Sequence, residues 1–517
     1  MPVLSFRQMA RLALAAAGLA CLPVADASAQ LPARQPVYPT AFHFTEAGPA
    51  PVDLPPAAAP VETPAEMPTA DAGCPTCAPA ETTYESCAAC SGEDDDCRFL
   101  EALFADNCGN NPLTDNGLYL NGWLSAGVMF NPDKPANGSN LPGPGFADRA
   151  NDAMLNQFYL IFGRDAGADE DEFGIGFQMD FVAGNDAKFT KAAGWDDSWG
   201  SGDGGSDYFQ YAMPQLYAEL YAPVMEGLRV KVGHFYTIIG YEVVPATGNF
   251  FYTHAYTMQY GEPFTHTGVL GTLSVSENVD ISLGVHNGWD DFEDEDANPY
   301  GLLGGITWTN DDDTLSVAWA MSYSEESNYL GTVNLPGGLT DLNTEADRYV
   351  QSLVVQAQLT EKLKYVVQSD YGVQSQGAVK LPNALGAPVL EDAQWYGLVN
   401  YLFYDLSDTL AAGVRYEWFH DDDGARVPNG QDLGTAGEVQ GTFQSVQGTQ
   451  FIRHGDYQAL TFGLNWKPHS CITVRPEVRY DWSNVSREDS FVPTSGVYDD
   501  LGDDNQFTFG GDVILTY

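Results

Sequence analysis

Residues 172–183 read EFGIGFQMDFVA, and large apolar side chains occupy every second position from Phe173 to Phe181. Small or polar residues lie between them, among them Gln178 and Asp180. A period of two places alternate side chains on opposite faces of a β-strand. An apolar face opposite a polar face over about ten residues is typical of a strand that contacts lipid on one side and water on the other.

The same alternation recurs along most of the chain. In residues 279–286, Val279, Ile281 and Leu283 alternate with polar or small residues, and residues 315–323 repeat the pattern. We predict 16 strands, near 118–130, 154–163, 172–183, 212–222, 228–240, 264–275, 279–289, 300–309, 314–324, 348–359, 363–373, 392–404, 408–419, 456–466, 472–482 and 506–517.

The predicted connections alternate between short and long. Short turns include 276–278, 310–313, 360–362, 405–407 and 467–471. Long loops include 131–153, 184–211, 241–263, 325–347, 420–455 and 483–505. This asymmetry is typical of a membrane barrel, with short periplasmic turns and long external loops. The sequence therefore predicts an all-β fold, a transmembrane antiparallel β-barrel of about 16 strands over residues 117–517.

Composition agrees with a barrel and excludes other classes of protein. The chain has 53 Gly, 27 Tyr, 27 Phe and 10 Trp among 517 residues, with a mean hydropathy of −0.22. Beyond residue 29 it has no apolar run of the roughly 18 to 20 residues that a spanning helix needs, so a closed barrel is the alternative that satisfies the backbone in lipid. The net charge of −49 argues against nucleic acid as a partner.

Residues 1–29 have the order of a secretory signal peptide. Arg7 and Arg11 precede an apolar stretch, and small residues end at Ala29. We expect cleavage near Ala29 and export to the outer membrane. A lipidated N-terminus at Cys21 is the alternative, but residues 18–20 lack the branched residue usually found upstream of such a site.

Residues 30–73 are rich in Pro and Ala, so we expect a disordered, semi-rigid tether, which could meet a partner in the cell envelope. A Cys-rich segment follows at 74–116, where a short amphipathic helix is expected near residues 99–104. Export to an oxidising compartment favours disulfides, with a zinc site or free thiols as alternatives. The candidate disulfide residues are Cys74, Cys77, Cys87, Cys90, Cys97 and Cys108.

Two belts of aromatic residues are expected at the membrane interfaces, where ring side chains sit at headgroup depth. The belt at the turn end would contain Trp308, Phe403, Trp466 and Tyr517. The belt at the loop end would contain Phe130, Phe181, Trp289, Tyr323, Tyr371, Trp418 and Trp482. Ordinary strand aromatics are the alternative interpretation.

The inward phase of the strands predicts charged residues that line the lumen. The basic ones are Arg229, Lys231, Lys364, Arg415, Arg475 and Arg479. The acidic ones are Asp180, Glu219, Asp280, Asp370, Glu417, Glu477, Asp481 and Asp512. Facing charges can orient polar solutes in a pore, or they can simply pair along the wall and keep it hydrated.

From about residue 120 to residue 517 the chain resembles the family of OmpL-like β-barrel porins. The resemblance rests on residues 121–123 (NGW), 173–184 with the inward Asp180, 231–242 (KVGHFYTIIGYE) and 415–421 (RYEWFHD). It implies a barrel with a pore, with no established substrate and no catalytic residues. General porins of this size form trimers, so a homotrimer is compatible with the resemblance.

In general porins the connection at the position of loop 241–263 folds inward and narrows the channel. By analogy this loop is the candidate constriction, and an aromatic loop packed over the outer rim is the alternative. The loop has no Lys or Arg. Its candidate constriction residues are Phe250, Phe251, Tyr252, His254, Tyr256 and Tyr260.

No enzyme, metal or cofactor site is predicted. The sequence has no Gly-x-Ser-x-Gly elbow, no His-Glu-x-x-His and no phosphate-binding glycine loop. Acidic clusters at 290–296, 421–423 and 499–504 could bind divalent cations weakly, although none has the spacing of a calcium loop.

The predicted function is therefore that of an outer-membrane porin. We expect passive diffusion of small hydrophilic solutes, with a mild preference for cations caused by the acidic loops, and outer-membrane lipid around the barrel. The alternative is a structural or adhesive surface protein with a filled barrel.

Overall fold

The computed structural model describes residues 111–167, 171–200, 208–293, 300–335, 338–380, 389–427, 454–485, 496–499 and 502–517, with residues 100, 103 and 104. Within the strands, the backbone alone is described at 327–335, 338–345, 378–380 and 389–390. The predicted signal peptide, tether and N-terminal cysteines lie outside the described residues, as do residues 99, 101 and 102 of the predicted short helix.

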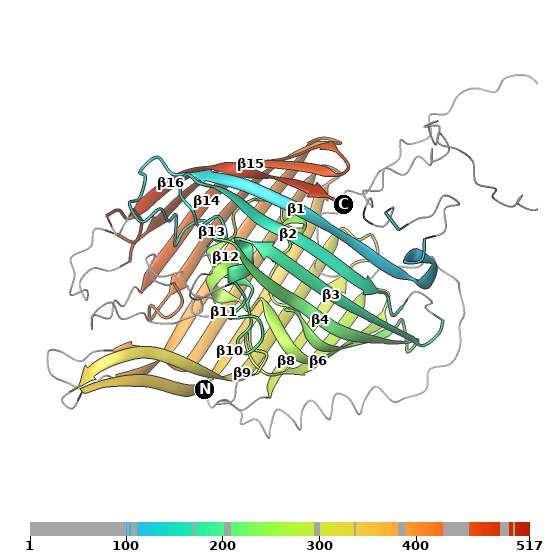
Figure 1. Cartoon of the computed structure of the whole chain (residues 1–517), viewed down its shortest axis with the longest axis horizontal. Helices are drawn as coiled ribbons and strands as arrows, with labels where there is room; N and C mark the ends of the chain where they lie inside the picture. The colour runs from blue at the N-terminus through green and yellow to red at the C-terminus, as the bar shows by residue number, and fades with distance from the viewer. Residues whose placement is uncertain are drawn as a thin grey trace, which may run out of the picture. The chain divides into compact units, whose positions relative to one another are not determined.

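Sixteen antiparallel strands form a closed barrel in which each strand pairs with its neighbours in the sequence and β1 pairs with β16 (Figure 1). The strands are β1 (Leu118–Phe130), β2 (Ala153–Arg164), β3 (Gly174–Gly184), β4 (Gln210–Ala222), β5 (Leu228–Tyr236), β6 (Thr265–Ser276), β7 (Val279–His286), β8 (Gly301–Thr309), β9 (Leu315–Leu335), β10 (Gly338–Thr360), β11 (Leu363–Lys380), β12 (Val389–Ser407), β13 (Leu410–Asp421), β14 (Gly455–His469), β15 (Ile472–Ser483) and β16 (Asn505–Thr516).

The seam between β1 and β16 is closed by regular pairing from Trp123↔Thr516 to Phe130↔Phe509. Backbone hydrogen bonds of 2.9 Å in both directions between Gly122 and Tyr517 extend the ladder. A closed ladder leaves no row of unpaired N–H and C=O groups, which lipid could not satisfy. The predicted fold class, a barrel of about 16 antiparallel strands, is confirmed.

Side chains alternate across the barrel wall as the sequence predicts. On β3, Ile175 is 68% exposed and faces outward, whereas Asp180 is 1% exposed and faces the interior. Outward apolar residues such as Leu220 and Val513 remain exposed on the same side of the wall. The exposed apolar face is the surface that lipid would cover.

The hairpin of β9 and β10 is much longer than predicted. It extends past the neighbouring strands in Figure 1, where it is yellow, and its backbone pairing reaches Leu335↔Gly338. The predicted long loop 325–347 is therefore mostly paired strand. The sequence there mixes apolar residues such as Val333 and Leu339 with many polar ones and with Pro336, so it lacks the sustained apolar alternation used to find strands. That alternation is expected only where one face contacts lipid.

The predicted aromatic belts need correction at three positions. Trp308 and Trp466 are 40% and 47% exposed on the outer surface, as expected. Phe403 lies in the inward phase of β12 and is buried. Trp289 follows the end of β7 and is also buried. The ring of Tyr517 is buried beside Tyr159. These three rings pack against protein rather than at the membrane interface.

Every strand has at least one buried residue whose side chain faces the interior. Segments 131–152 and 237–264 pack there, together with residues of other connections such as Asp186 and Tyr498. Buried inward examples, one from each strand in order, are Ser125, Tyr159, Asp180, Tyr217, Phe235, Leu270, His286, Leu303, Ala320, Val350, Val366, Val399, Arg415, Thr461, Arg475 and Asp512. Among the described residues, no helix is long and apolar enough to cross a membrane.

Candidate functional site: an inward loop held by three arginines

Residues 237–264, which connect β5 to β6, form the segment that we call the inward loop. It contains two short helical turns, η3 (Ala246–Gly248) and η4 (Thr257–Gly261). The loop makes hydrogen bonds with inward side chains of β2, β11, β12, β13 and β15. It therefore crosses the barrel interior from its own strands to the opposite wall.

Arg475 on β15 is the first of three arginines that hold this loop. Its Nη1 donates hydrogen bonds to the carbonyl oxygens of Ala246, Asn249 and Phe251 at 2.8, 2.8 and 2.9 Å. Its Nε and Nη2 donate to the Asp512 carboxylate at 2.8 and 2.7 Å. The guanidinium thus joins three carbonyl groups of the loop backbone to the wall, and its charge is balanced by Asp512 on the neighbouring strand.

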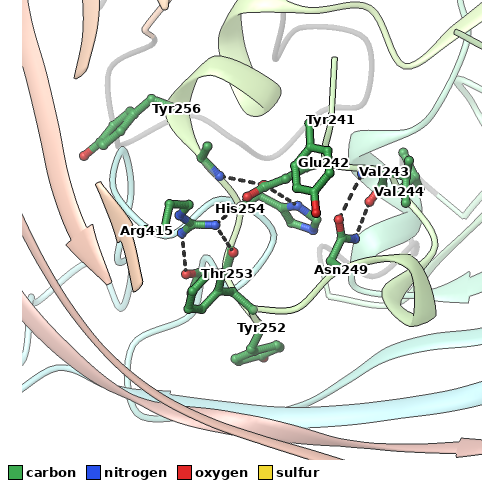
Figure 2. Close-up of polar contacts among 12 residues, drawn as sticks. Tyr241, Glu242, Val243, Val244, Asn249, Tyr252, Thr253, His254, Tyr256 and Arg415 are labelled. Carbon is green, nitrogen blue, oxygen red and sulfur yellow. Dashed lines mark hydrogen bonds and ion pairs between the residues drawn. The ribbon is translucent and has the colours of Figure 1, made fainter. Parts of the chain in front are cut away.

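Arg415 on β13 is the second anchor. Its Nη1 lies 2.7 Å from Glu242 Oε1 and also donates to the Thr253 carbonyl oxygen at 2.7 Å (Figure 2). The other Glu242 oxygen accepts the Ala255 N–H at 2.9 Å and lies 3.1 Å from His254 Nδ1. Burial raises the pKa of Glu242, but Arg415 and the hydrogen bonds outweigh it, so the pKa stays well below the ordinary value.

Arg479 on β15 is the third anchor, and it also reaches the other inner segment. Its Nη1 donates to the His254 carbonyl oxygen at 2.6 Å, and its Nη2 donates to the Gly143 carbonyl oxygen at 3.2 Å. Carboxylate oxygens of Asp481 and Glu417 lie 2.8 and 3.1 Å from the same Nη2. One guanidinium therefore joins the inward loop, segment 131–152 and two wall carboxylates.

Wall carboxylates accept the backbone N–H groups of the loop. Glu477 accepts the N–H groups of Tyr252 and Thr253 at 2.8 and 3.2 Å, and Glu417 accepts the N–H of Tyr256. The Tyr256 hydroxyl also donates to Asp481 at 3.1 Å. Because the wall satisfies several donors and several acceptors of the loop backbone, the loop can remain inside the barrel with little regular secondary structure.

The predicted constriction residues are all buried in the interior. Phe250 and Phe251 pack against Phe403, with ring centroids 4.8 and 6.2 Å from it. The Tyr252 hydroxyl donates to Asn156 at 3.0 Å, and the Tyr260 hydroxyl donates to the Pro142 carbonyl oxygen at 3.1 Å. The remaining two, His254 and Tyr256, belong to the anchor contacts above.

The end of the loop near β6 is held by a different contact. Glu262 accepts a short hydrogen bond from the Gln368 amide, whose Nε2 also lies 3.0 Å from Asp370. Asp370 is in addition bound by Ser352 Oγ at 2.6 Å. Burial, together with the neighbouring Asp370 carboxylate, raises the pKa of Glu262 well above its ordinary value. Two buried carboxyl groups therefore meet without a cation between them among the described residues.

The predicted lumen residues divide into two groups. The loop anchors Arg415, Arg475, Arg479, Glu417, Glu477, Asp481 and Asp512 are brought together, as described above. Asp180 lies apart from them and accepts the Tyr159 hydroxyl at 2.6 Å.

The second group lies nearer the turn end. There Arg229 pairs with Glu219 at 3.1 Å, Lys231 lies over the Tyr217 ring at 4.5 Å, and Asp280 accepts Ser274 Oγ at 2.6 Å. Lys364 is half-buried on β11.

Acidic groups predominate in the interior. Among the described residues, sixteen Asp and Glu side chains are buried, against seven Lys and Arg side chains. Each of the three anchor arginines is paired with a carboxylate and also donates to carbonyl groups of the loop. The positive charge that the sequence assigns to the lumen wall is thus largely neutralised where it meets the loop.

Several partners of the loop were not predicted from the sequence. Buried hydrogen bonds that hold the loop involve three of its own side chains, Glu242, Asn249 and Glu262. On the wall they involve Gln157 and Gln368. One signal was available: β15 has Arg475, Glu477, Arg479 and Asp481 in a single inward phase, and a fully charged inward face needs partners. No group of His, Cys, Asp and Glu that could hold a metal ion occurs in the described ranges.

The sequence matches the model of a known protein family. The model of the family described as "Putative beta-barrel porin-2, OmpL-like" matches residues 117–517. No curated protein sequence is significantly similar to the chain.

Among solved structures, the outer membrane channel DcaP of Acinetobacter baumannii matches with 10% identity, covering 80% of this chain and 99% of that chain, at a TM-score of 0.46. OprB of Pseudomonas putida matches with 12% identity, 78% and 95% coverage and a TM-score of 0.46. The trimer form of OmpT from Vibrio cholerae matches with 11% identity, 77% and 99% coverage and a TM-score of 0.46.

The first prediction concerns Arg475. Replacing it with Gln removes the donor to three loop carbonyl groups and leaves Asp512 buried without its cation. Breaking a buried pair in this way lowers the free energy of unfolding by on the order of 3–5 kcal/mol. We expect amide hydrogen exchange in residues 246–254 to accelerate at least about tenfold. The control is Arg229→Gln, an inward arginine that pairs with Glu219 near the turn end and should leave this exchange unchanged. Equal exchange in both variants would contradict the anchor role.

The second prediction concerns pH at Glu262. Because its pKa is raised, the folded chain keeps a proton that the unfolded chain has already lost, so the stability at this end of the loop is complete in acid and falls as pH rises. Exchange in residues 256–264, corrected for the intrinsic rate, should be faster at about pH 8 than at about pH 5. Glu262→Gln should abolish this difference, whereas a difference that persists in the variant would place its origin elsewhere.

Proposed function

The chain belongs to the family of OmpL-like β-barrel porins, and from this membership we propose that it is a narrow channel for passive diffusion of small hydrophilic solutes across the outer membrane. The observation that carries the proposal is the inward loop, held across the interior by Arg415, Arg475 and Arg479. We infer that this loop, with its candidate residues from Phe250 to Tyr260, sets the narrowest cross-section.

The nature of the anchors supports a channel over a barrel that is filled for structural reasons. A buried ion pair usually stabilises a protein no more than apolar residues of similar volume do, because both charges lose water. A barrel interior that only needed filling would be occupied at lower cost by apolar side chains. Charged anchors instead suit a loop that must hold a fixed position in a hydrated lumen.

A mild preference for cations follows from the distribution of charge. The anchor arginines are neutralised by Asp512, Glu242 and Asp481, so they would contribute little attraction for anions. The acidic stretches at 290–296 and 499–504 add negative charge on the connections at the loop end. Such a potential concentrates cations at the mouth of a channel.

The alternative is a structural or adhesive surface protein. It is favoured by one observation, which is that every strand has a buried inward residue. In that case the acidic loops or the N-terminal extension would carry the function, and the barrel would be closed to solutes. A homotrimer remains a proposal that rests on the size of the barrel.

The third prediction concerns conductance. Gly240 contacts the Glu262 side chain, so residues 242–260 can be replaced by a three-residue Gly-Ser-Gly linker with little change in the ends of the loop. The refolded full chain should give small conductance steps in planar bilayers, and the shortened variant should give larger ones. The Arg229→Gln variant, altered outside the loop, should resemble the unmodified protein. Absence of steps in the full chain, with steps in the shortened variant, would favour the filled-barrel alternative.

The fourth prediction concerns selectivity. The Debye length is about 8 Å at physiological salt and about 30 Å at 0.01 M, so the field of the acidic loops reaches further in dilute salt. Reversal potentials across a salt gradient should show a mild cation preference at the higher ionic strength and a stronger one at the lower. Anion preference would contradict the neutralisation of the anchor arginines. A preference unchanged by dilution would place the selecting carboxylates within the lumen.

A further inference from the structure

A second cluster of buried arginines lies apart from the loop anchors, toward the loop end of the barrel. It contains Arg348 on β10, Trp289 after β7, Trp395 on β12 and Arg426, five residues after the end of β13. The guanidinium carbons of Arg348 and Arg426 lie 4.8 and 4.7 Å from the Trp289 ring centroid. Arg426 also lies 4.8 Å from the Trp395 ring centroid, and the two indoles meet at 69°.

Arg426 is the unusual member of this cluster, because its hydrogen-bonding capacity is largely unused. The side chain is 2% exposed, and its Nε donates to the Tyr260 carbonyl oxygen at 2.7 Å. Within the described part of the chain, no carboxylate forms an ion pair with it and neither Nη atom has a hydrogen-bond partner. The Trp289 Nε1 beside it is also buried with no partner there. A buried guanidinium in this state is costly unless an anion satisfies it.

The carboxylates nearest to Arg426 already serve other donors. Asp421 accepts the backbone N–H groups of residues 425–427 at 2.8 to 2.9 Å. Glu326 accepts the backbone N–H of Trp289 at 3.1 Å, and its other carboxylate oxygen lies 3.4 Å from Arg348 Nη1. Asp290 accepts the N–H groups of residues 264 and 265. None of the three presents a free pair of oxygens to the Nη edge of Arg426.

The electrostatics of the cluster are dominated by burial of two neighbouring guanidinium groups. Burial, together with the charge of Arg348, lowers the pKa of Arg426 to about 9, and the nearby carboxylates of Asp421, Glu326 and Asp290 offset only part of this effect. A bound anion would reverse both effects, because it replaces the lost hydration of the guanidinium and offsets the repulsion between the two arginines.

We propose that Arg426, with Arg348 and Trp289 beside it, binds the carboxylate group of a small organic acid. The two indoles cover the guanidinium, and Tyr260 occupies its Nε, so the edge that carries the two Nη groups is left for a ligand. That edge offers two coplanar donors, which match the two oxygens of a flat carboxylate. Trp289 Nε1 supplies a third donor close to the same place.

This site goes beyond passive diffusion, because it makes the protein saturable by one class of solute. It is also compatible with a channel that prefers cations. The acidic mouth acts over a Debye length, whereas hydrogen bonding to Arg426 acts only at contact distance. Binding can therefore be measured in the absence of any transport.

The test uses the full chain in detergent micelles, with acetate as the probe. Sodium acetate replaces sodium chloride at constant ionic strength while tryptophan fluorescence is recorded. We expect a saturable change that reports on Trp289 and Trp395, and an affinity at least about tenfold lower in Arg426→Gln. The matched control is Arg149→Gln, which removes an arginine that lies 3.5 Å from the Tyr208 ring centroid, outside this cluster. It should bind acetate as the unmodified protein does.

Folding of Arg426→Gln is judged by heat-modifiable electrophoretic mobility. If that variant does not fold, two further variants test the same site. Arg426→Lys retains the charge without the two-pronged edge, and Trp289→Phe retains a ring without Nε1; both should weaken acetate binding. A change that never saturates, unaltered binding in these variants, or sulfate binding as tightly as acetate would overturn the proposal. Acetate binding without conductance steps would leave the site intact and refute the diffusion function alone.

Discussion

The structure depends on one constraint, which is that a sheet surrounded by lipid must pair every backbone N–H and C=O group within itself. Closure of β1 against β16, extended by Gly122 and Tyr517, meets that constraint. Once the backbone is satisfied by the wall, inward side chains are free for other uses. In this protein they hold segments of chain inside the barrel, and the arginines of β13 and β15 have the largest share in doing so.

The anchor arginines do not have the role that an inward arginine has in a simple pore. In a simple pore, an inward arginine faces water and attracts anions. Here Arg475 is shared between Asp512 and three carbonyl oxygens, and Arg479 between two carboxylates and two carbonyl oxygens. Their charge is used to position backbone. The part of the interior charge that can act on solutes is then the acidic excess, with Arg426 as an exception among the described residues.

Much of the architecture could be predicted from the sequence, because alternation with a period of two is a local property. Residues 172–183 show this, since both the strand and the inward direction of Asp180 were predicted and found. The hairpin of β9 and β10 was underestimated because its outer part lacks a sustained apolar alternation. Phe403 was assigned to the wrong face, because the phase of a strand is ambiguous where both sets contain large apolar residues.

The candidate site could be predicted only in part, because its contacts join residues far apart in the chain. The charged inward face of β15 was visible in the sequence. The pairing of Arg415 with Glu242 was not, since the two residues are separated by 173 positions. Nor could the sequence indicate that segment 131–152 also lies inside, where Gly143 meets Arg479. Such contacts depend on how loops pack in three dimensions, which no local pattern specifies.

The seam between β1 and β16 has a consequence for assembly. Ser125 on β1 bonds to Asp512 on β16, 387 residues later in the chain. Pairing between strands so distant carries a large loop-closure entropy, and contacts of this kind make folding slow. The first strand must therefore wait, with one edge unpaired, until nearly all the others have been made. Arg475 receives its carboxylate partner from the same late strand, so the inward loop acquires its full set of anchors only at the moment when the barrel closes.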